Sequence, residues 1–490
     1  MPRISYSLLL DKKGKDLQIC KKRLVSSYGK AFKKRLYYIQ EQMHIHQTAV
    51  LNRWNMASKD YKACCNFFNN PNASLMELTD ELSESCAAHC PKNQHVLVLQ
   101  DTTEVNYNDH NGRLKVNDPD LGVLSNNKST GLLLHAGLAV CADSQLPFGL
   151  AHGQVGHRPF ERVARTSLER EMQPLEEKES YRWLQTVHKS RTCLSKASQL
   201  TVIGDRESDI YELFADRPDQ DTHLLVRSNT NRLTASGEKL SDCLSRSPWQ
   251  GSKTVAVSAN EHRKARQAIL QVRYTQVILP PPAKRKSLLQ GYDPEQVWVV
   301  ELLETLDSVP PDEEPIHWRL LTTHRVESLN DALQITEWYT LRWLIEELFR
   351  ILKQGLNVEE SQFERGAALK KLLLLSLQTS WKILLMKQER AGNHQREASV
   401  CFSAQQVDFL EVMQPQLEGN TAKQQNPHPS KSLAWAAWLI ARLGGWKPAP
   451  LDKRPFGVVS LCRGMCVFHQ RWQGWKAAQQ FIQNPQTFPT

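Results

Sequence analysis

The chain has 490 residues, of which 40% are hydrophobic and 23% are charged, and its net charge at pH 7 is +10. This composition is typical of a folded globular protein and excludes a disordered chain, a collagen-like chain and a low-complexity linker. The most apolar stretch, residues 372–386, is interrupted by polar side chains, and the first apolar run ends at Leu10. We therefore expect no membrane span and no secretory signal, and a cytoplasmic protein of about three domains.

The 11 cysteines are scattered along the chain. Cys462 and Cys466 lie close together, as do His44 and His46, but neither pair has a second pair at the spacing of a zinc site. We expect free, reduced thiols and no structural metal at these pairs.

The excess positive charge is concentrated near the N-terminus. Residues 1–60 carry 13 basic and 4 acidic side chains, a net charge of +9, so the rest of the chain carries about +1. A cluster of this kind neutralises phosphates and releases counterions, which favours a segment that binds DNA or RNA. A solvated basic helix face is the alternative interpretation. The clustered residues are Lys21, Lys22, Arg23, Lys30, Lys33, Lys34 and Arg35.

The apolar pattern predicts a helical N-terminal domain followed by a core of five strands. The strands are predicted from continuous apolar runs separated by turns, at residues 95–101, 131–141, 146–154, 200–205 and 224–227. The polar, charge-rich stretch 160–190 is predicted as a helix, and a short helix is predicted at 209–214.

The sequence becomes β-rich again after the last core strand. Strands are predicted at residues 253–258, 268–279, 296–303 and 317–322, and helical periodicity resumes at Ser328. We therefore predict an insertion between the last core strand and the next helix. The predicted domains are a basic helical domain (1–90), the first part of the core (91–228), the insertion (229–325), the second part of the core (326–385) and a helical C-terminal domain (386–490).

Two predicted core strands end in an aspartate, Asp101 and Asp205. A carboxylate beside a buried strand must be paired or bound to a metal, and ligands in α/β folds lie at the carboxyl ends of the strands. A helix cap or turn residue is the alternative for each aspartate. The occurrence of both favours a site.

A third carboxylate lies on a helix predicted over residues 337–353. At about 100° per residue, Tyr339, Arg342, Glu346, Arg350 and Lys353 share one face of this helix, opposite an apolar stripe. An ordinary amphipathic helix with an Arg342–Glu346 ion pair is the alternative. Three converging carboxylates can hold two Mg²⁺ ions for phosphodiester cleavage or transfer, with the cations on the helix gripping the phosphates.

The spacing of the polar residues on this helix resembles a known signature. Tyr339, Arg342, Glu346 and Lys353 follow the Y-R-E-K pattern of the IS4 family of DDE transposases. The segments around Asp101 and Asp205 resemble, in the same order, the motifs that carry that family's first two catalytic aspartates. The resemblance extends from about residue 60 to the C-terminus.

This resemblance implies an α/β fold with a ribonuclease H-like catalytic core, a β-rich insertion, and helical N- and C-terminal domains. It also implies cut-and-paste transposition of an insertion sequence through strand cleavage, hairpin formation and strand transfer. The partners would be double-stranded DNA, as element ends and as target, and a second copy of the chain in a DNA-bound dimer. In a bacterium the protein would lie on the nucleoid when bound to DNA.

The resemblance also assigns roles to individual residues. Asp101, Asp205 and Glu346 would be catalytic and would ligate Mg²⁺, for which Mn²⁺ could substitute. Trp318 would stack a base that is flipped out during hairpin formation, a core tryptophan being the alternative. The residues expected to contact DNA are Tyr339, Arg342, Lys353, Arg350, Trp318, Arg227, Lys33, Lys34 and Arg35.

Some features leave alternatives open. The N-terminal segment lacks the acidic residue that follows glycine in the family motif, so recognition of a particular element end is the weakest implication. The helices with Trp435 and Trp438 fit either a dimerisation region or a buried bundle. A nuclease that cuts without strand transfer, and a decayed copy that binds DNA without cutting, are the alternative functions.

Overall fold

A computed structural model of the chain describes residues 30–108, 113–115, 117–161, 166–257, 264–285, 287–394, 396–448 and 455–483. The basic residues Lys21 to Arg23 lie outside the described residues, whereas Lys33, Lys34 and Arg35 lie on α2 (Lys30–His46). Every cysteine in the described part of the chain is a free thiol.

Five strands form the core of the sheet in the order β4-β3-β1-β5-β6. The central strand β1 pairs antiparallel with β3 and parallel with β5, and β6 continues the parallel side. This is the ribonuclease H-like arrangement implied by the resemblance, so the predicted fold class is confirmed. The strands are β1 (His95–Asn106), β3 (Thr130–Cys141), β4 (Pro147–Gly156), β5 (Gln199–Gly204) and β6 (Thr222–Arg227), with a short edge strand β2 (Gly122–Val123) beside β3.

Helices cover both faces of this core. Side chains alternate along a strand, so the two faces of β1 pack against different helices. Leu97 and Leu99 belong to the same hydrophobic cluster as α11 (Gly366–Gln388). Val96 and Val98 pack on the other face with α6 (Tyr181–Cys193) and α7 (Tyr211–Ala215). Burial on both sides explains why these strands are continuous apolar runs in the sequence.

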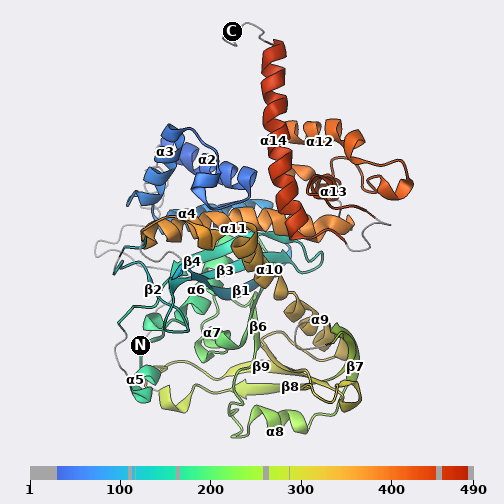
Figure 1. Cartoon of the computed structure of the whole chain (residues 1–490). Helices are drawn as coiled ribbons and strands as arrows, with labels where there is room; N and C mark the ends of the chain where they lie inside the picture. Colours follow the sequence, from blue (N-terminus) through green and yellow to red (C-terminus); the bar gives the residue numbers. More distant parts are fainter. Residues whose placement is uncertain are drawn as a thin grey trace.

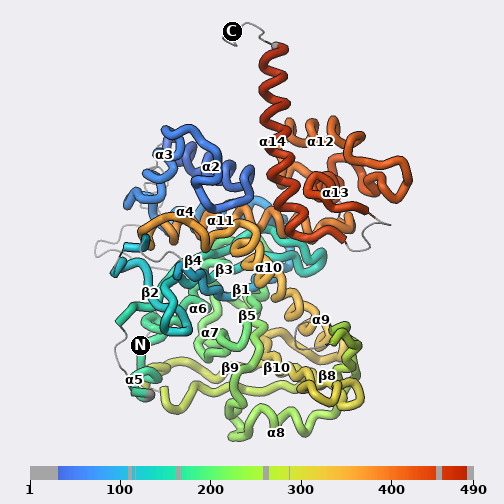
Figure 2. The backbone as a smooth tube through the Cα atoms, viewed as in Figure 1, coloured from blue at the N-terminus to red at the C-terminus, as the bar shows by residue number. Residues whose placement is uncertain are grey.

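The insertion continues the core sheet. Its last strand, β10, pairs antiparallel with β6, and the sheet then runs through β9, β8 and β7. The segments labelled β8, β9 and β10 lie below the core in Figure 2. The hydrogen bonds that β10 supplies occupy an edge of β6 that would otherwise be open. The elements are α8 (Leu240–Ser245), β7 (Gly251–Val257), β8 (Arg266–Leu279), β9 (Glu295–Glu304) and β10 (His317–Thr322).

Both terminal regions are helical, as predicted, and α11 lies between the N-terminal helices and the core sheet (Figure 1). Trp435 and Trp438 are buried within the chain, which corresponds to the bundle alternative, while α14 extends away from the body in Figure 1. No helix in the described residues is both long and apolar enough to cross a membrane. The remaining helices are α3 (Ser58–Asn69), α4 (Leu75–His89), α12 (Ala404–Leu417), α13 (Leu433–Leu443) and α14 (Val458–Gln483).

Two helix predictions are correct only in part. In the stretch 160–190, of which residues 162–165 lie outside the described residues, the structure has a short α5 (Ser167–Glu171), a 3₁₀ turn and most of α6; helix is interrupted because Pro174 lacks an N–H and disfavours helix in the residue before it. The stretch 337–353 divides into α9 (Leu329–Thr340) and α10 (Trp343–Arg350), followed by a π turn (Ile351–Gly355). The predicted boundary at residue 385 falls inside α11.

Three histidines gather beside α9, away from the predicted carboxylate site. The Thr201 hydroxyl lies 2.7 Å from the Nε2 atoms of both His95 and His324. The His324 ring stacks on His223 at a centroid distance of 4.0 Å and packs against Trp338 of α9. Burial lowers the pKa of His95 to about 4 and that of His324 to about 2. The cluster therefore favours neutral imidazoles.

Replacing His324 with Gln is expected to reduce the acid sensitivity of folding. A histidine whose pKa is lowered on folding stabilises the protein fully above about pH 6.5, and this stabilisation is lost as the pH falls toward the folded pKa. We expect the free energy of unfolding of the unchanged protein to fall by about 2 kcal/mol more than that of the variant between pH 7.5 and pH 5. Urea unfolding at both pH values measures this difference, and equal losses would contradict it.

Candidate functional site

Asp101 and Asp205 lie at the same level on neighbouring parallel strands. The register pairs Leu99 with Ile203, which places each aspartate two residues further along its own chain. Asp205 directly follows β5 and accepts a hydrogen bond of 2.9 Å from the Glu207 N–H, so it caps a 3₁₀ turn.

The prediction that β1 ends at Asp101 is wrong. The strand continues to Asn106, and Asp101 is paired with Ala136 of β3. Pairing with β5 stops at Leu99, whereas antiparallel pairing with β3 continues. The carboxylate is therefore held on a strand that extends past its parallel neighbour, where its side chain can meet groups from another element.

Arg342 links the first and third predicted carboxylates. Its Nη1 donates to Asp101 Oδ2 at 2.8 Å, and its Nη2 donates to Glu346 Oε1 at 2.5 Å. Arg342 lies at the break between α9 and α10, at the residue that directly precedes α10. One guanidinium thus brings together two carboxylates, one of which lies 241 residues from Arg342 along the chain.

The surroundings of Asp101 disfavour the ionised form of its carboxyl group. Burial raises the pKa of Asp101 to about 7, and the nearby Asp205 and Glu346 carboxylates add to this rise. The Arg342 guanidinium and the Thr102 N–H, which donates to Asp101 Oδ1 at 2.7 Å, act in the opposite direction. The three predicted carboxylates therefore share one electrostatic environment that requires positive charge.

The donor set fits a hard divalent cation, because Mg²⁺ and Mn²⁺ prefer carboxylate oxygens. In the arrangement seen, however, no group of three or more His, Cys, Asp and Glu side chains within the described ranges is placed to hold an ion. Arg342 engages Asp101 and Glu346 instead. Binding of a cation through those two oxygens therefore requires Arg342 to release at least one of them.

Tyr339, Trp318 and Arg227 border this site. The Tyr339 ring, at the end of α9, is buried and packs edge-on against Trp318 of β10 at a centroid distance of 5.4 Å. Burial raises the pKa of Tyr339, and the charges of Arg342 and Arg227 oppose that rise. Arg227, at the end of β6, also donates to the His317 carbonyl at 3.2 Å. The insertion therefore contributes an aromatic side chain beside the core residues.

The other predicted DNA contacts lie apart from this group. Arg350 is exposed and pairs with Glu347 rather than with Glu346, and Lys353 lies on the π turn that follows α10. Lys33 and Lys34 are exposed on α2, a helix of the N-terminal region. Arg35 pairs with Asp60 of α3 at 3.4 Å and lies over the Tyr38 ring.

Arg182 is a neighbour of the site that the sequence did not indicate. This buried side chain of α6 donates to the Thr102 hydroxyl at 2.8 Å and to Glu207 at 2.9 Å. It thereby joins the residue after Asp101 to a residue that follows Asp205. An arginine on a polar helix has no local pattern that reveals such contacts, so sequence reasoning had no signal for it.

Comparison with known proteins finds similarity to a solved structure and to a family model. A solved structure similar to this chain is that of the piggyBac transposase in a synaptic complex with hairpin DNA, with 9% sequence identity and a TM-score of 0.33. That similarity covers 69% of this chain and 56% of the piggyBac chain, so the present chain spans little more than half of it. The family model described as the transposase DDE domain matches residues 181–380. This match covers less than half of the chain, contains Asp205 and Glu346, and begins after Asp101.

Proposed function

We propose that this protein is a DDE transposase of the IS4 family, close to the Tn5 transposase, that moves an insertion sequence by cut and paste. The observation that carries the proposal is the contact of Arg342 with both Asp101 and Glu346, with Asp205 in register beside them. A match to the transposase DDE domain over residues 181–380 supports the broader assignment to the DDE transposases.

Asp101, Asp205 and Glu346 would hold Mg²⁺, or Mn²⁺ in its place. When bound, two such ions supply activation of the attacking oxygen and stabilisation of the leaving oxygen in an in-line displacement. Arg342 presents a planar guanidinium that can bind a phosphate in two places once it releases a carboxylate. Arg227 lies beside it, and Tyr339 lies between the two arginines and Trp318.

The same site would carry out the later steps of transposition. After one strand is cut, the freed 3′-hydroxyl would attack the opposite strand to form a hairpin, and the reopened ends would join target DNA. The Trp318 ring packs against Tyr339 and is only partly buried. Part of its indole surface is therefore accessible for stacking on a base. We propose that two copies of the chain act together on two element ends.

The proposal is tested with DNA that spans the junctions of the element flanking the gene. The purified chain is incubated with this DNA and Mg²⁺ or Mn²⁺, with EDTA as the control, and nicks, hairpins and joined products are separated on denaturing gels. Transposition requires all three products. Cutting without joining would identify a nuclease, and binding without any cutting would identify a decayed copy.

In this assay, replacing Trp318 with Ala is expected to slow hairpin formation about tenfold and to leave the first nick within about twofold, because loss of one base-stacking contact costs about 1–3 kcal/mol. Replacement with Phe should retain most hairpin formation. An equal loss of both steps in the alanine variant would instead indicate a role in folding, since Trp318 also packs against the hydrophobic core.

A further inference from the structure

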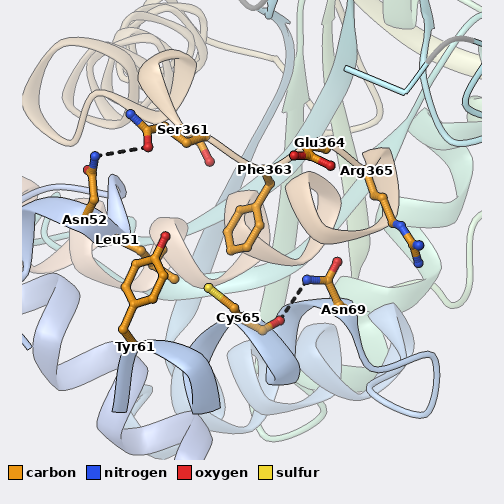
Figure 3. A pocket seen from close by; sticks show the side chains of 10 residues that line it. Leu51, Asn52, Tyr61, Cys65, Asn69, Ser361, Phe363, Glu364 and Arg365 are labelled. Carbon is orange, nitrogen blue, oxygen red and sulfur yellow. Dashed lines mark hydrogen bonds between the residues drawn. The ribbon is translucent and has the colours of Figure 1, made fainter. Parts of the chain in front are cut away.

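A pocket between the N-terminal helices and the core is used by none of the steps above. Its volume is about 390 Å³, within the range of small-ligand sites, and it lies between α3 and residues 361–365, which lead into α11. It shares no residue with the group formed by Asp101, Asp205, Arg342 and Glu346. Figure 3 shows side chains from both segments facing its interior.

Aromatic rings meet in this pocket. Phe363 points toward α3 in Figure 3, and its ring packs against Phe68 at a centroid distance of 4.9 Å. Tyr61 of α3 also lines the pocket and keeps 39% of its surface exposed. Two aromatic side chains with accessible faces provide stacking surfaces for a flat ring system.

Amide groups lie at the rim of the pocket. The Asn52 side chain donates to the Gln362 side-chain oxygen at 3.0 Å across the two segments, and the Asn69 side chain donates to the Cys65 carbonyl at 3.0 Å. Carboxamides offer both donors and acceptors, which is the pattern needed to bind the edge of a heterocycle. Stacking and edge recognition are thus available in one place.

The charges in the lining of the pocket are balanced. The lining carries one cation and one anion, Arg365 and Glu364. This balance favours an uncharged ring over a phosphate.

We propose that this pocket binds a single unpaired nucleobase of a DNA strand. The inference rests on the proposed function, which supplies the DNA. A base must leave its pair and its stack to expose both faces and its pairing edge, as the pocket requires. Phe363 and Tyr61 would stack the base, and the carboxamides would bind its edge. In Figure 3, the Arg365 side chain points away from the interior of the pocket. The backbone of the DNA strand would pass on that outer side, beside Arg365.

Protection of Cys65 tests occupancy directly, because this partly exposed thiol lines the pocket. The full chain is alkylated with iodoacetamide and digested, and modification is read at Cys65 and at Cys243, a reference thiol in the insertion. Deoxyadenosine monophosphate or thymidine monophosphate, at concentrations on the order of millimolar, should protect Cys65 from alkylation but should not protect Cys243. Deoxyribose 5-phosphate, which lacks a base, should protect neither.

Substitution tests the same contact on DNA. Replacing Phe363 with Ala should weaken binding of a single-stranded oligonucleotide of about 16 nucleotides roughly tenfold, and Phe363→Tyr should bind like the unchanged protein. Phe363 also packs on Phe68, so its replacement could disturb folding. Tyr61→Ala disturbs the fold less, and we expect it to weaken oligonucleotide binding by a similar factor. Phe160→Ala removes an exposed ring outside the pocket and is the matched control.

The outcomes separate this inference from the proposed function. Equal protection of Cys65 by the base-free sugar phosphate, or unchanged DNA binding by both Phe363→Ala and Tyr61→Ala, would overturn the pocket assignment while metal-dependent cleavage still stood. Protection by nucleotides in a chain that never cuts DNA would support the pocket and refute the transposase. Absence of both DNA binding and nucleotide protection would refute both.

Discussion

Replacing Glu346 with Gln is expected to reduce metal-dependent DNA cleavage by at least about 10³-fold, a loss of about 4 kcal/mol of transition-state stabilisation. The substitution keeps the size of the side chain and removes the charge that would hold a cation. Asp101→Asn and Asp205→Asn are expected to have losses of the same order. Single-turnover cleavage with Mg²⁺, on DNA carrying the element ends, measures the rates.

The adjacent residue provides the control for this prediction. Glu347 is also a carboxylate of α10, but it pairs with Arg350 and Lys387 on another side of the helix. Glu347→Gln should lower stability and leave cleavage within about threefold, because no group of the proposed site loses its charge. If Glu346→Gln cut DNA as fast as Glu347→Gln, Glu346 would not be a metal ligand.

Replacing Arg342 with Ala is expected to lower the free energy of unfolding by about 2 kcal/mol when no divalent cation is present. The variant leaves Asp101 buried without the cation that compensates it, and partly buried ion pairs of this kind are costly to break from one side. The same substitution should slow cleavage about 100-fold, because a bidentate phosphate contact is lost.

Added Mg²⁺ separates the two roles of Arg342. We expect Mg²⁺ to stabilise the Arg342→Ala variant more than the unchanged protein, because the carboxylates no longer need to leave a guanidinium to bind the cation. Urea unfolding with and without Mg²⁺ measures both effects. Arg350→Ala, which removes an exposed ion pair from the same helix, should change stability by less than about 1 kcal/mol. Identical responses of both variants to Mg²⁺ would contradict the bridging role.

The strands were predictable because burial on both faces leaves a strong local pattern. β3 is apolar along nearly its whole length, and β1 and β5 carry apolar runs before Asp101 and Asp205. The end of β1 was not predictable, since it depends on how far β3 continues to pair. The length of β1 thus depends on its pairing with β3, and the sequence of β1 alone does not reveal how far that pairing extends.

The break between α9 and α10 has a similar explanation. Leu341 and Arg342 include neither glycine nor proline, so nothing local predicts an interruption. Arg342 makes its two ion pairs at this break, and those contacts come from β1 and from α10 itself. The Y-R-E-K spacing predicted which residues of this helix would form the site, but the position of Arg342 between two carboxylates depends on the tertiary structure.

The joining of β10 to β6 has a mechanical consequence. Leu320, Leu321 and Thr322 pair with Arg227, Val226 and Leu225, so the strand that carries Trp318 is hydrogen-bonded to a core strand. Movement of the insertion relative to the core would break these hydrogen bonds. We therefore expect the distance between Trp318 and the carboxylates to stay constant. Under the proposed function, DNA that contacts both Trp318 and the carboxylates would have to bend and unpair itself, so we expect the deformability of the DNA to influence which sequences are processed.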